Sequence, residues 1–215
     1  MSLRLYAIPF STNVERVALA MGHKGLEAEV VMCDPRDRSP IRDVSGQELV
    51  PVLVDGDEVV TDSSRIVEHL ERRFPERALF PSEPARAAEV RLFVDWFDRA
   101  WKRPPNELEA EIRKPRPSRQ AIQDHRAALR GSLQQFDGLL DGRPYLMGDD
   151  FTAADVAAFP FLKYAFGLPP SDDELFHRIL AENLTLEGAH PRVEEWLQRV
   201  DVRPRGPLQD LISSS

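Results

Sequence analysis

The feature that most constrains this chain is a pair of short, valine-rich runs on either side of a tight turn within residues 50–62. The Asp55-Gly56 pair between them is typical of a two-residue hairpin loop. Residues 3–8 and 28–33 also have strand-like patterns, and an amphipathic helix is predicted between them. A β-α-β unit needs a parallel strand pair, and a hairpin adds antiparallel strands. The sequence therefore predicts a mixed four-stranded sheet with helices packed on it.

The chain changes character after about residue 80, because no convincing strand follows Glu83. Helical apolar faces recur instead, and the clearest helix start is Thr152 with Asp155 three residues later, a capping-box pattern. We predict an α/β domain over residues 1–80, a proline-containing linker over 81–87 and an all-helical domain over 88–215.

The stretch after the second predicted strand and the end of the chain have weaker patterns. The polar stretch over residues 34–46 is expected to be a surface loop or a poorly formed helix. Two short helices are expected near the end of the chain, one from about Asp172 and one from Pro191.

Composition excludes several classes of protein. The net charge of -8 argues against a nucleic-acid binder, which needs a basic face. The single cysteine, Cys33, cannot form an internal disulfide and is expected to be a buried filler, and the five histidines form no metal-ligand motif. No apolar run approaches the roughly 20 residues that span a bilayer, and a signal-peptide pattern is absent. We therefore expect a cytoplasmic protein with no metal site and no membrane or nucleic-acid partner.

Four segments in this order resemble the cytosolic glutathione transferase family: PFSTNVERV at 9–17, LVPVLVDG at 49–56, TDSSRIVEHL at 61–70 and GDDFTAADVAAFP at 148–160. The first looks most like the serine-type enzymes, particularly the phi class. The resemblance covers essentially the whole chain. It implies a thioredoxin-like βαβ-ββα domain that binds glutathione, followed by an all-helical domain that binds an apolar electrophile.

Ser11 is the candidate catalytic residue. Glutathione reacts as its thiolate, and a hydroxyl that donates to the sulfur lowers the pKa of the thiol. A hydroxyl at a helix start also acts with the positive end of the helix dipole. The resemblance assigns this role to Ser11, with Thr12 and Asn13 as alternatives. The competing interpretation is that all three residues only cap the helix.

The rest of glutathione is assigned by the resemblance to two further places. Val50 precedes Pro51, which is cis in the family, and would bond the peptide through its main chain. Ser63 would hold the γ-glutamyl carboxylate at a helix start, and Asp62 would pair with the ammonium group. The alternatives are a trans proline at a strand start and an N-cap without a ligand.

One position departs from the family pattern. The residue directly before Val50 is usually lysine or glutamine near the glycyl end of glutathione, but here it is Leu49. The polar loop offers three other cations for the glycyl carboxylate, and the sequence does not choose among them: Arg36, Arg38 and Arg42.

The electrophile pocket is expected to include Phe10, Trp96, Phe97 and Trp101, although part of this aromatic group must belong to the core. The predicted function is conjugation of glutathione, as co-substrate and without another cofactor, to small hydrophobic electrophiles by a homodimer. Peroxidase, isomerase or dehalogenase activity at the same site is one alternative. A non-catalytic binding or scaffold protein is the other.

Overall fold

The predicted hairpin joins β3 (Val52–Asp55) to β4 (Glu58–Thr61) in the computed structural model, which describes residues 3–209. Strand β1 (Leu3–Ala7) pairs in parallel with β2 (Glu29–Met32) and antiparallel with β3. The strand order is β2-β1-β3-β4. The predicted mixed four-stranded sheet is thus confirmed.

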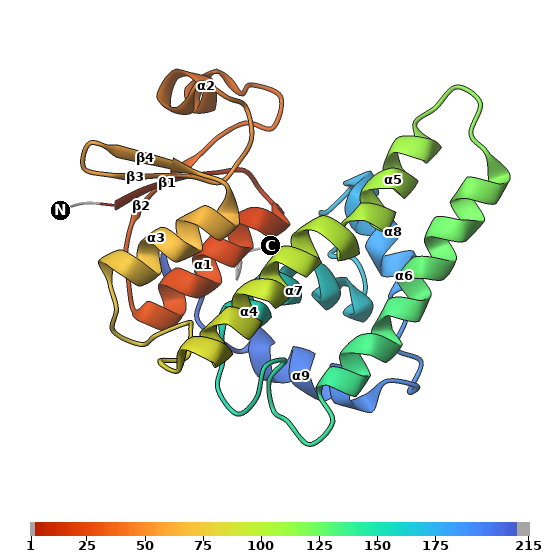
Figure 1. The fold of residues 1–215 in the computed structure, drawn as a ribbon. Coiled ribbons are helices and arrows are strands. Elements are labelled where there is room, and N and C mark those ends of the chain that lie inside the picture. Colours follow the sequence, from red (N-terminus) through yellow and green to blue (C-terminus); the bar gives the residue numbers. More distant parts are fainter. Residues whose placement is uncertain (1–2, 210–215) are drawn as a thin grey trace. The chain divides into compact units, whose positions relative to one another are not determined.

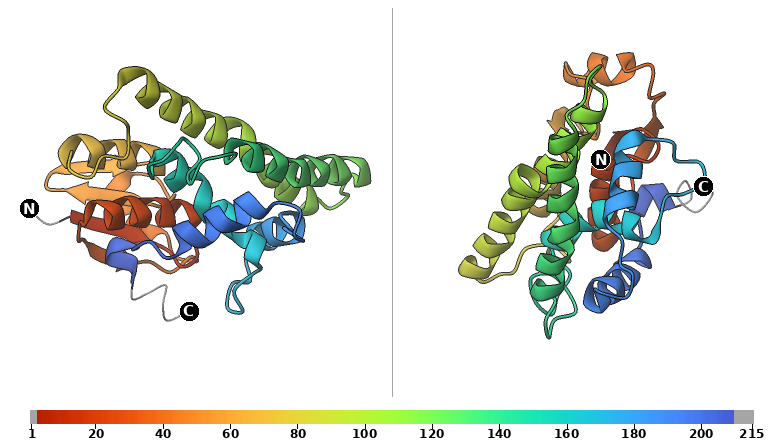
Figure 2. Two further views of the ribbon diagram at one scale, coloured as in Figure 1. Left: turned by 90° about the horizontal axis from the view of Figure 1, so that it is seen from below. Right: turned by 90° about the vertical axis from the view of Figure 1, so that its right-hand side faces the viewer.

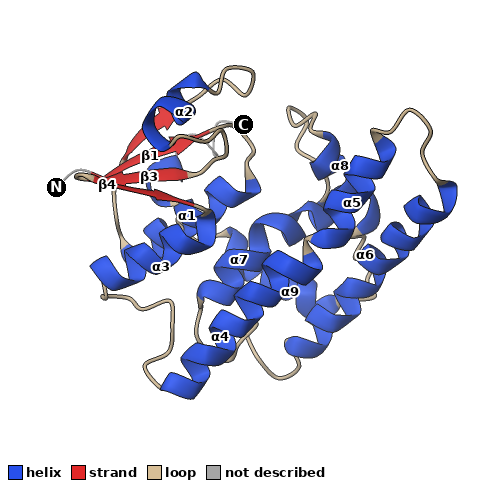
Figure 3. Ribbon diagram, turned by 45° about the horizontal axis from the view of Figure 1, so that its top comes forward, coloured by secondary structure: helices blue, strands red, loops and turns tan. Residues whose placement is uncertain are grey.

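Helices cover both faces of this sheet. Helices α1 (Thr12–Lys24) and α3 (Ser63–Arg73) lie side by side on one face, and the shorter α2 (Ser39–Ser45) lies on the other (Figures 1 and 3). Helix α2 lies within the polar stretch 34–46, for which a surface loop or a poorly formed helix is predicted. Its Ile41 packs on Cys33, which is buried as expected. Burial raises the pKa of the Cys33 thiol, which disfavours the thiolate.

The C-terminal segment of the described chain belongs to this first unit. Its short 3-10 turn η3 (Gly206–Leu208) packs on α1, and buried Arg205 pairs with Glu15 at 3.3 Å. A Cβ atom on Gly22 would lie 2.0 Å from the carbonyl oxygen of Pro204. Gly22 is therefore required for this packing. Helix α1 ends at Gly25, which has a φ of 70°.

The second unit is helical, apart from an isolated bridge between Tyr145 and Gly148. Helices α5 and α6 run in opposite directions, joined by the loop 113–118 (Figures 1 and 2). The elements of this unit are α4 (Pro84–Trp96), the π-helical turn η1 (Phe97–Trp101), α5 (Arg103–Ile112), α6 (Arg119–Leu139), α7 (Ala153–Leu162), the 3-10 turn η2 (Lys163–Phe166), α8 (Leu175–Asn183) and α9 (Pro191–Asp201).

The two units divide the chain differently from the predicted domains in two places. Helix α4 begins at Pro84, inside the stretch 81–87 predicted as a linker. Residues 203–209 pack with the first unit, whereas the predicted helical domain ran over 88–215. The helix expected from about Asp172 begins at Leu175, because Asp172 is a buried acceptor for the Glu174 N–H and His177 rather than a helical residue.

The predicted capping box at the start of α7 is present. Asp155 has no exposed surface and accepts hydrogen bonds from the N–H and hydroxyl of Thr152, at 2.9 and 3.2 Å. It also accepts from the Leu146 N–H at 3.0 Å and from Trp196 Nε1 at 2.9 Å. Burial raises the pKa of Asp155, and these four donors oppose that rise. One carboxylate therefore links α7 to α9.

Thr152→Ala is expected to lower the free energy of unfolding by roughly 1 kcal/mol, because it removes the acceptor for the Ala154 N–H at the helix start. Urea unfolding followed by circular dichroism measures this loss. Thr185→Ala, at an exposed threonine, is the control and should change little. Unchanged stability combined with lost glutathione binding would contradict the structural role of Thr152.

Among residues 3–209, no helix has the length and apolar character needed to cross a bilayer.

Candidate active site

The turn between β1 and α1 presents Ser11 at the start of a helix. Ser11 is the N-cap of α1, and its Oγ accepts a hydrogen bond from the Val14 N–H at 3.3 Å. Among the described residues, its hydroxyl proton has no acceptor. The side chain is half-buried, so the proton remains available to an incoming group. The helix start adds a favourable dipole for a negatively charged partner.

The residue before Ser11 has an unusual backbone conformation. Phe10 has a φ of 58°, in the left-handed region that non-glycine residues seldom occupy. Asp62, at the start of α3, has a φ of 72°. Such conformations cost energy and are enriched at functional sites. The two helix starts that the resemblance assigns to glutathione both follow such a residue.

Asp62 and Ser63 have different surroundings. Asp62 is exposed and is the N-cap of α3, where its Oδ1 accepts from the N–H groups of Ser64 and Arg65 at 3.0 and 3.1 Å. Ser63 is buried and is the first residue of α3. Asp62 thus caps α3 through one of its two carboxylate oxygens.

Arg16 is a site residue that sequence reasoning missed. Its side chain is only 1% exposed, and Nη1 donates to Ser63 Oγ at 3.4 Å. Ser63 Oγ in turn donates to Asn13 Oδ1 at 3.4 Å. These contacts join the first turn of α3 to the first two turns of α1. The available signal was a charged residue beside the apolar positions Val14 and Val17 of a short helix.

The three candidates for thiol contact can now be distinguished. Thr12 is buried, and the Asn13 amide oxygen is bonded to Ser63. Ser11 combines partial exposure with an uncommitted hydroxyl proton. The geometry favours Ser11 among the three.

The segment before β3 has main-chain groups that do not take part in the sheet. The Val50–Pro51 peptide bond is cis, as the resemblance implied. Pairing of β3 with its neighbours begins at Val52, so the N–H and C=O of Val50 lie outside the β ladder. Leu49 is 77% exposed, and both its main-chain groups bond the side chain of Gln47. The Gln47 side chain therefore forms its hydrogen bonds within its own loop.

The three arginines proposed for the glycyl carboxylate have different partners. Arg42 pairs with Glu48, and Arg38 Nε donates to the Pro35 carbonyl at 2.9 Å. Arg36 is exposed, and its guanidinium bonds to none of the described residues.

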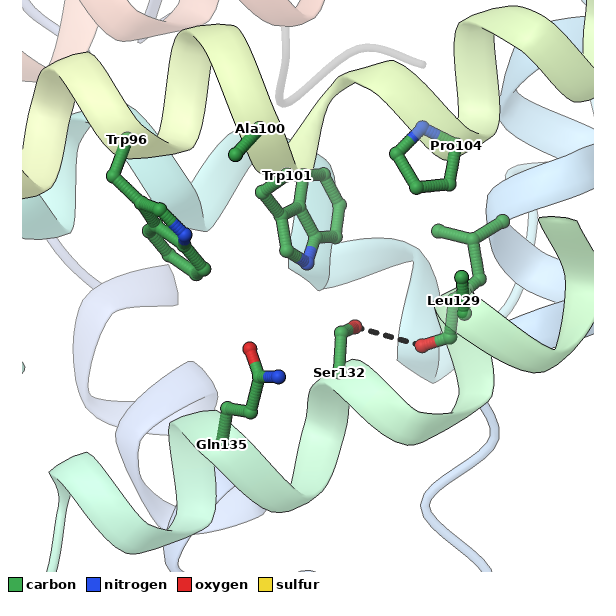
Figure 4. A pocket seen from close by; sticks show the side chains of 8 residues that line it. Trp96, Ala100, Trp101, Pro104, Leu129, Ser132 and Gln135 are labelled. Atoms are coloured by element: carbon green, nitrogen blue, oxygen red, sulfur yellow. Dashed lines mark hydrogen bonds between the residues drawn. The ribbon is translucent and has the colours of Figure 1, made fainter.

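The aromatic residues expected at the electrophile pocket have different exposures. Phe10, in the first unit, is half-buried. In the second unit Phe97 has no exposed surface and stacks on Trp101 with ring centroids 4.5 Å apart. Trp96 and Trp101 line a cleft of ≈ 220 Å³ against α6 (Figure 4).

Comparisons with known proteins identify the family of both parts of the chain. A model of the glutathione S-transferase N-terminal domain matches residues 5–78, and one of the C-terminal domain matches residues 119–199. A solved glutathione S-transferase from Rhodospirillum rubrum F11 is 30% identical, with a TM-score of 0.72, covering 94% of this chain and 89% of that one.

This chain belongs to the glutathione S-transferase family. Two curated members illustrate the range of its relatives. Glutathione S-transferase 3 of Zea mays is 28% identical over 94% of this chain and 90% of its own length. FtsZ-localized protein A of Caulobacter vibrioides is 29% identical over 72% of this chain and 73% of its own length.

Proposed function

We propose that this chain is a glutathione transferase that conjugates glutathione to small apolar electrophiles, and that the Ser11 hydroxyl stabilises the reacting thiolate. The observation that carries the proposal is the hydrogen bonding of Ser11: its oxygen caps α1 while its proton is uncommitted. Donation of that proton to sulfur favours the charged form of the thiol. The thiolate then attacks the electrophilic carbon, and a leaving group departs or a proton is taken up.

Binding of the other parts of glutathione is assigned to the elements around Ser11. The γ-glutamyl carboxylate accepts from the N–H and hydroxyl of Ser63 at the start of α3, where the helix dipole favours an anion. Arg16, buried against Ser63, adds positive charge to that position. The Asp62 oxygen that is not used in capping receives the ammonium group. The cysteinyl backbone bonds Val50 in the manner of an added strand.

We propose that Trp96 and Trp101, which line a cleft within the second unit, form the acceptor site for the electrophile. Phe10 of the first unit is half-buried, and its contact with the electrophile stays a prediction. Phe97 supports the Trp101 ring and does not contact the electrophile, because it is wholly buried and stacks on Trp101. We also propose that the protein is cytoplasmic and that it forms a two-fold homodimer. Sedimentation equilibrium tests the dimer against the 24.4 kDa mass of one chain.

Retention on immobilised glutathione and turnover of an aryl halide test the proposed function together. We expect the protein to be retained, to elute with free glutathione and to release halide only when glutathione is present. Ser63→Ala should weaken retention, whereas Ser64→Ala, at the next residue of α3, should not. If the protein is retained but gives no product with a panel of electrophiles, conjugation is contradicted and only the binding of glutathione is supported.

A scaffold function is the second candidate, and the similarity to FtsZ-localized protein A favours it. The name of that relative describes a location rather than a reaction. Under this alternative the chain passes through the glutathione matrix unretained.

Glutathione-dependent peroxidase, isomerase or dehalogenase activity would share the Ser11 site. Assays with a hydroperoxide and an α-halo ketone separate these reactions from conjugation.

A further inference from the structure

The helical unit contains a cleft of ≈ 220 Å³ whose lining comes from the end of α4, η1, the start of α5, and α6 (Figure 4). Its walls are mostly apolar and include Trp96, Trp101 and Leu129. Ser132 and Gln135, both on α6, supply polar groups on the opposite side. Within residues 3–209, no charged side chain lines the cleft. This volume is below that of typical sites for drug-sized ligands, so the cleft suits a smaller molecule.

Trp101 brings an unsatisfied donor to this cleft. The residue is 4% exposed, and Nε1 has no hydrogen-bond partner among the described residues. Figure 4 shows its ring nitrogen turned toward α6, on the side where Ser132 lies. The Ser132 hydroxyl donates to the Leu129 carbonyl at 2.7 Å. By contrast, Trp196, the other buried tryptophan, donates its Nε1–H to Asp155.

A buried donor without an acceptor is destabilising, and such groups in folded proteins usually find a partner in protein, water or ligand. The stacking of Trp101 on Phe97, with an interplanar angle of 15°, holds the indole plane in place. A hydrogen-bond acceptor must therefore bind next to the N–H, because the indole ring does not turn toward one. The absence of lining charges selects a neutral acceptor, since a carboxylate placed there would be buried without a cation.

We propose that this cleft binds a small, neutral aromatic carbonyl compound, with its ring between the apolar walls and its carbonyl oxygen accepting from Trp101 Nε1. Trp96 and Trp101 also form the proposed acceptor site, so this inference rests on the proposed function and names the class of compound that these residues contact. Binding is measured without glutathione, so its failure is distinguishable from a failure of conjugation.

Titration of the ¹⁵N-labelled protein with acetophenone, without glutathione, tests the proposal. The chain has three tryptophans, so three indole N–H resonances are assigned by Trp→Phe substitution. We expect the Trp101 resonance to move downfield and to saturate, because its proton gains an acceptor. Isopropylbenzene, which has a similar shape but no acceptor, should bind about fivefold to tenfold more weakly. Benzoate should bind more weakly than acetophenone because of its charge.

Trp101→Phe retains a ring but removes the donor, and we expect it to bind acetophenone and isopropylbenzene equally. Trp96→Phe is the matched control. It alters the neighbouring wall without removing the buried donor, so the preference for the carbonyl compound should persist. If Trp101→Phe does not fold, the comparison of the two probes on the unaltered protein still decides the question.

Three results would overturn the proposal. The first is a Trp101 resonance that acetophenone does not move. The second is equal affinity of the unaltered protein for both uncharged probes, which would show an apolar cleft whose N–H bonds only water. The third is a Trp101 resonance that shifts with protein concentration alone while neither probe binds, which would make this face an interface between copies of the chain.

Discussion

Ser11→Ala is expected to lower the conjugation rate at pH 7 by about tenfold to a hundredfold and to displace the pH-rate profile to higher pH. Without the hydroxyl donor, the pKa of bound glutathione rises toward that of the free thiol. Each unit of this rise removes about 1.4 kcal/mol of thiolate stabilisation. The reactive fraction at neutral pH falls accordingly, and the rate recovers as the pH is raised. Glutathione affinity should change little, because the proposed contacts of its other parts are elsewhere.

The measurement is the rate of conjugation between pH 6 and 9 at saturating glutathione. Because Ser11 Oγ also caps α1, the alanine variant should lose about 1 kcal/mol of stability, which denaturant unfolding checks separately. Ser11→Thr retains the hydroxyl and should retain the parent profile. Thr12→Ala and Asn13→Ala are the positional controls. A shift in one of these variants, with none in Ser11→Ala, would reassign the thiol contact; no shift in any of the three would exclude the serine-type mechanism.

Asp155→Asn is expected to lower the free energy of unfolding by about 2–4 kcal/mol. The carboxylate is completely buried and accepts from four donors, so both its oxygens are used as acceptors. An amide has nearly the same shape but presents N–H groups to at least one of these donors. The connection of α7 to Trp196 on α9 is weakened at the same time. Urea unfolding monitored by tryptophan fluorescence measures the loss.

Asp150→Asn provides the control, since it makes the same chemical change at an exposed position three residues before Ala153. It should leave the unfolding midpoint within experimental scatter. Equal stabilities of the two variants would mean that the hydrogen bonds around Asp155 contribute nothing beyond those of a surface carboxylate.

Features with local causes could be predicted from the sequence. The hairpin at Asp55-Gly56, the capping box at Thr152 and Asp155, and the position of Ser11 at a helix start all depend on residues within a few positions of one another. Turn chemistry and capping are properties of such short segments. The order of strands and helices followed from the same signals, and with it the fold class.

Features that depend on distant residues were decided by the tertiary structure. Arg16 meets Ser63 across 47 positions, and Trp196 meets Asp155 across 41, so neither pair has a local signature. The need for glycine at position 22 comes from the close approach of Pro204, which is distant in the sequence. The sequence likewise gives no sign that the Trp101 N–H is buried without a partner. Local sequence determines which backbone conformations are favourable, but only the packed chain determines which polar groups lose water and which partners reach them.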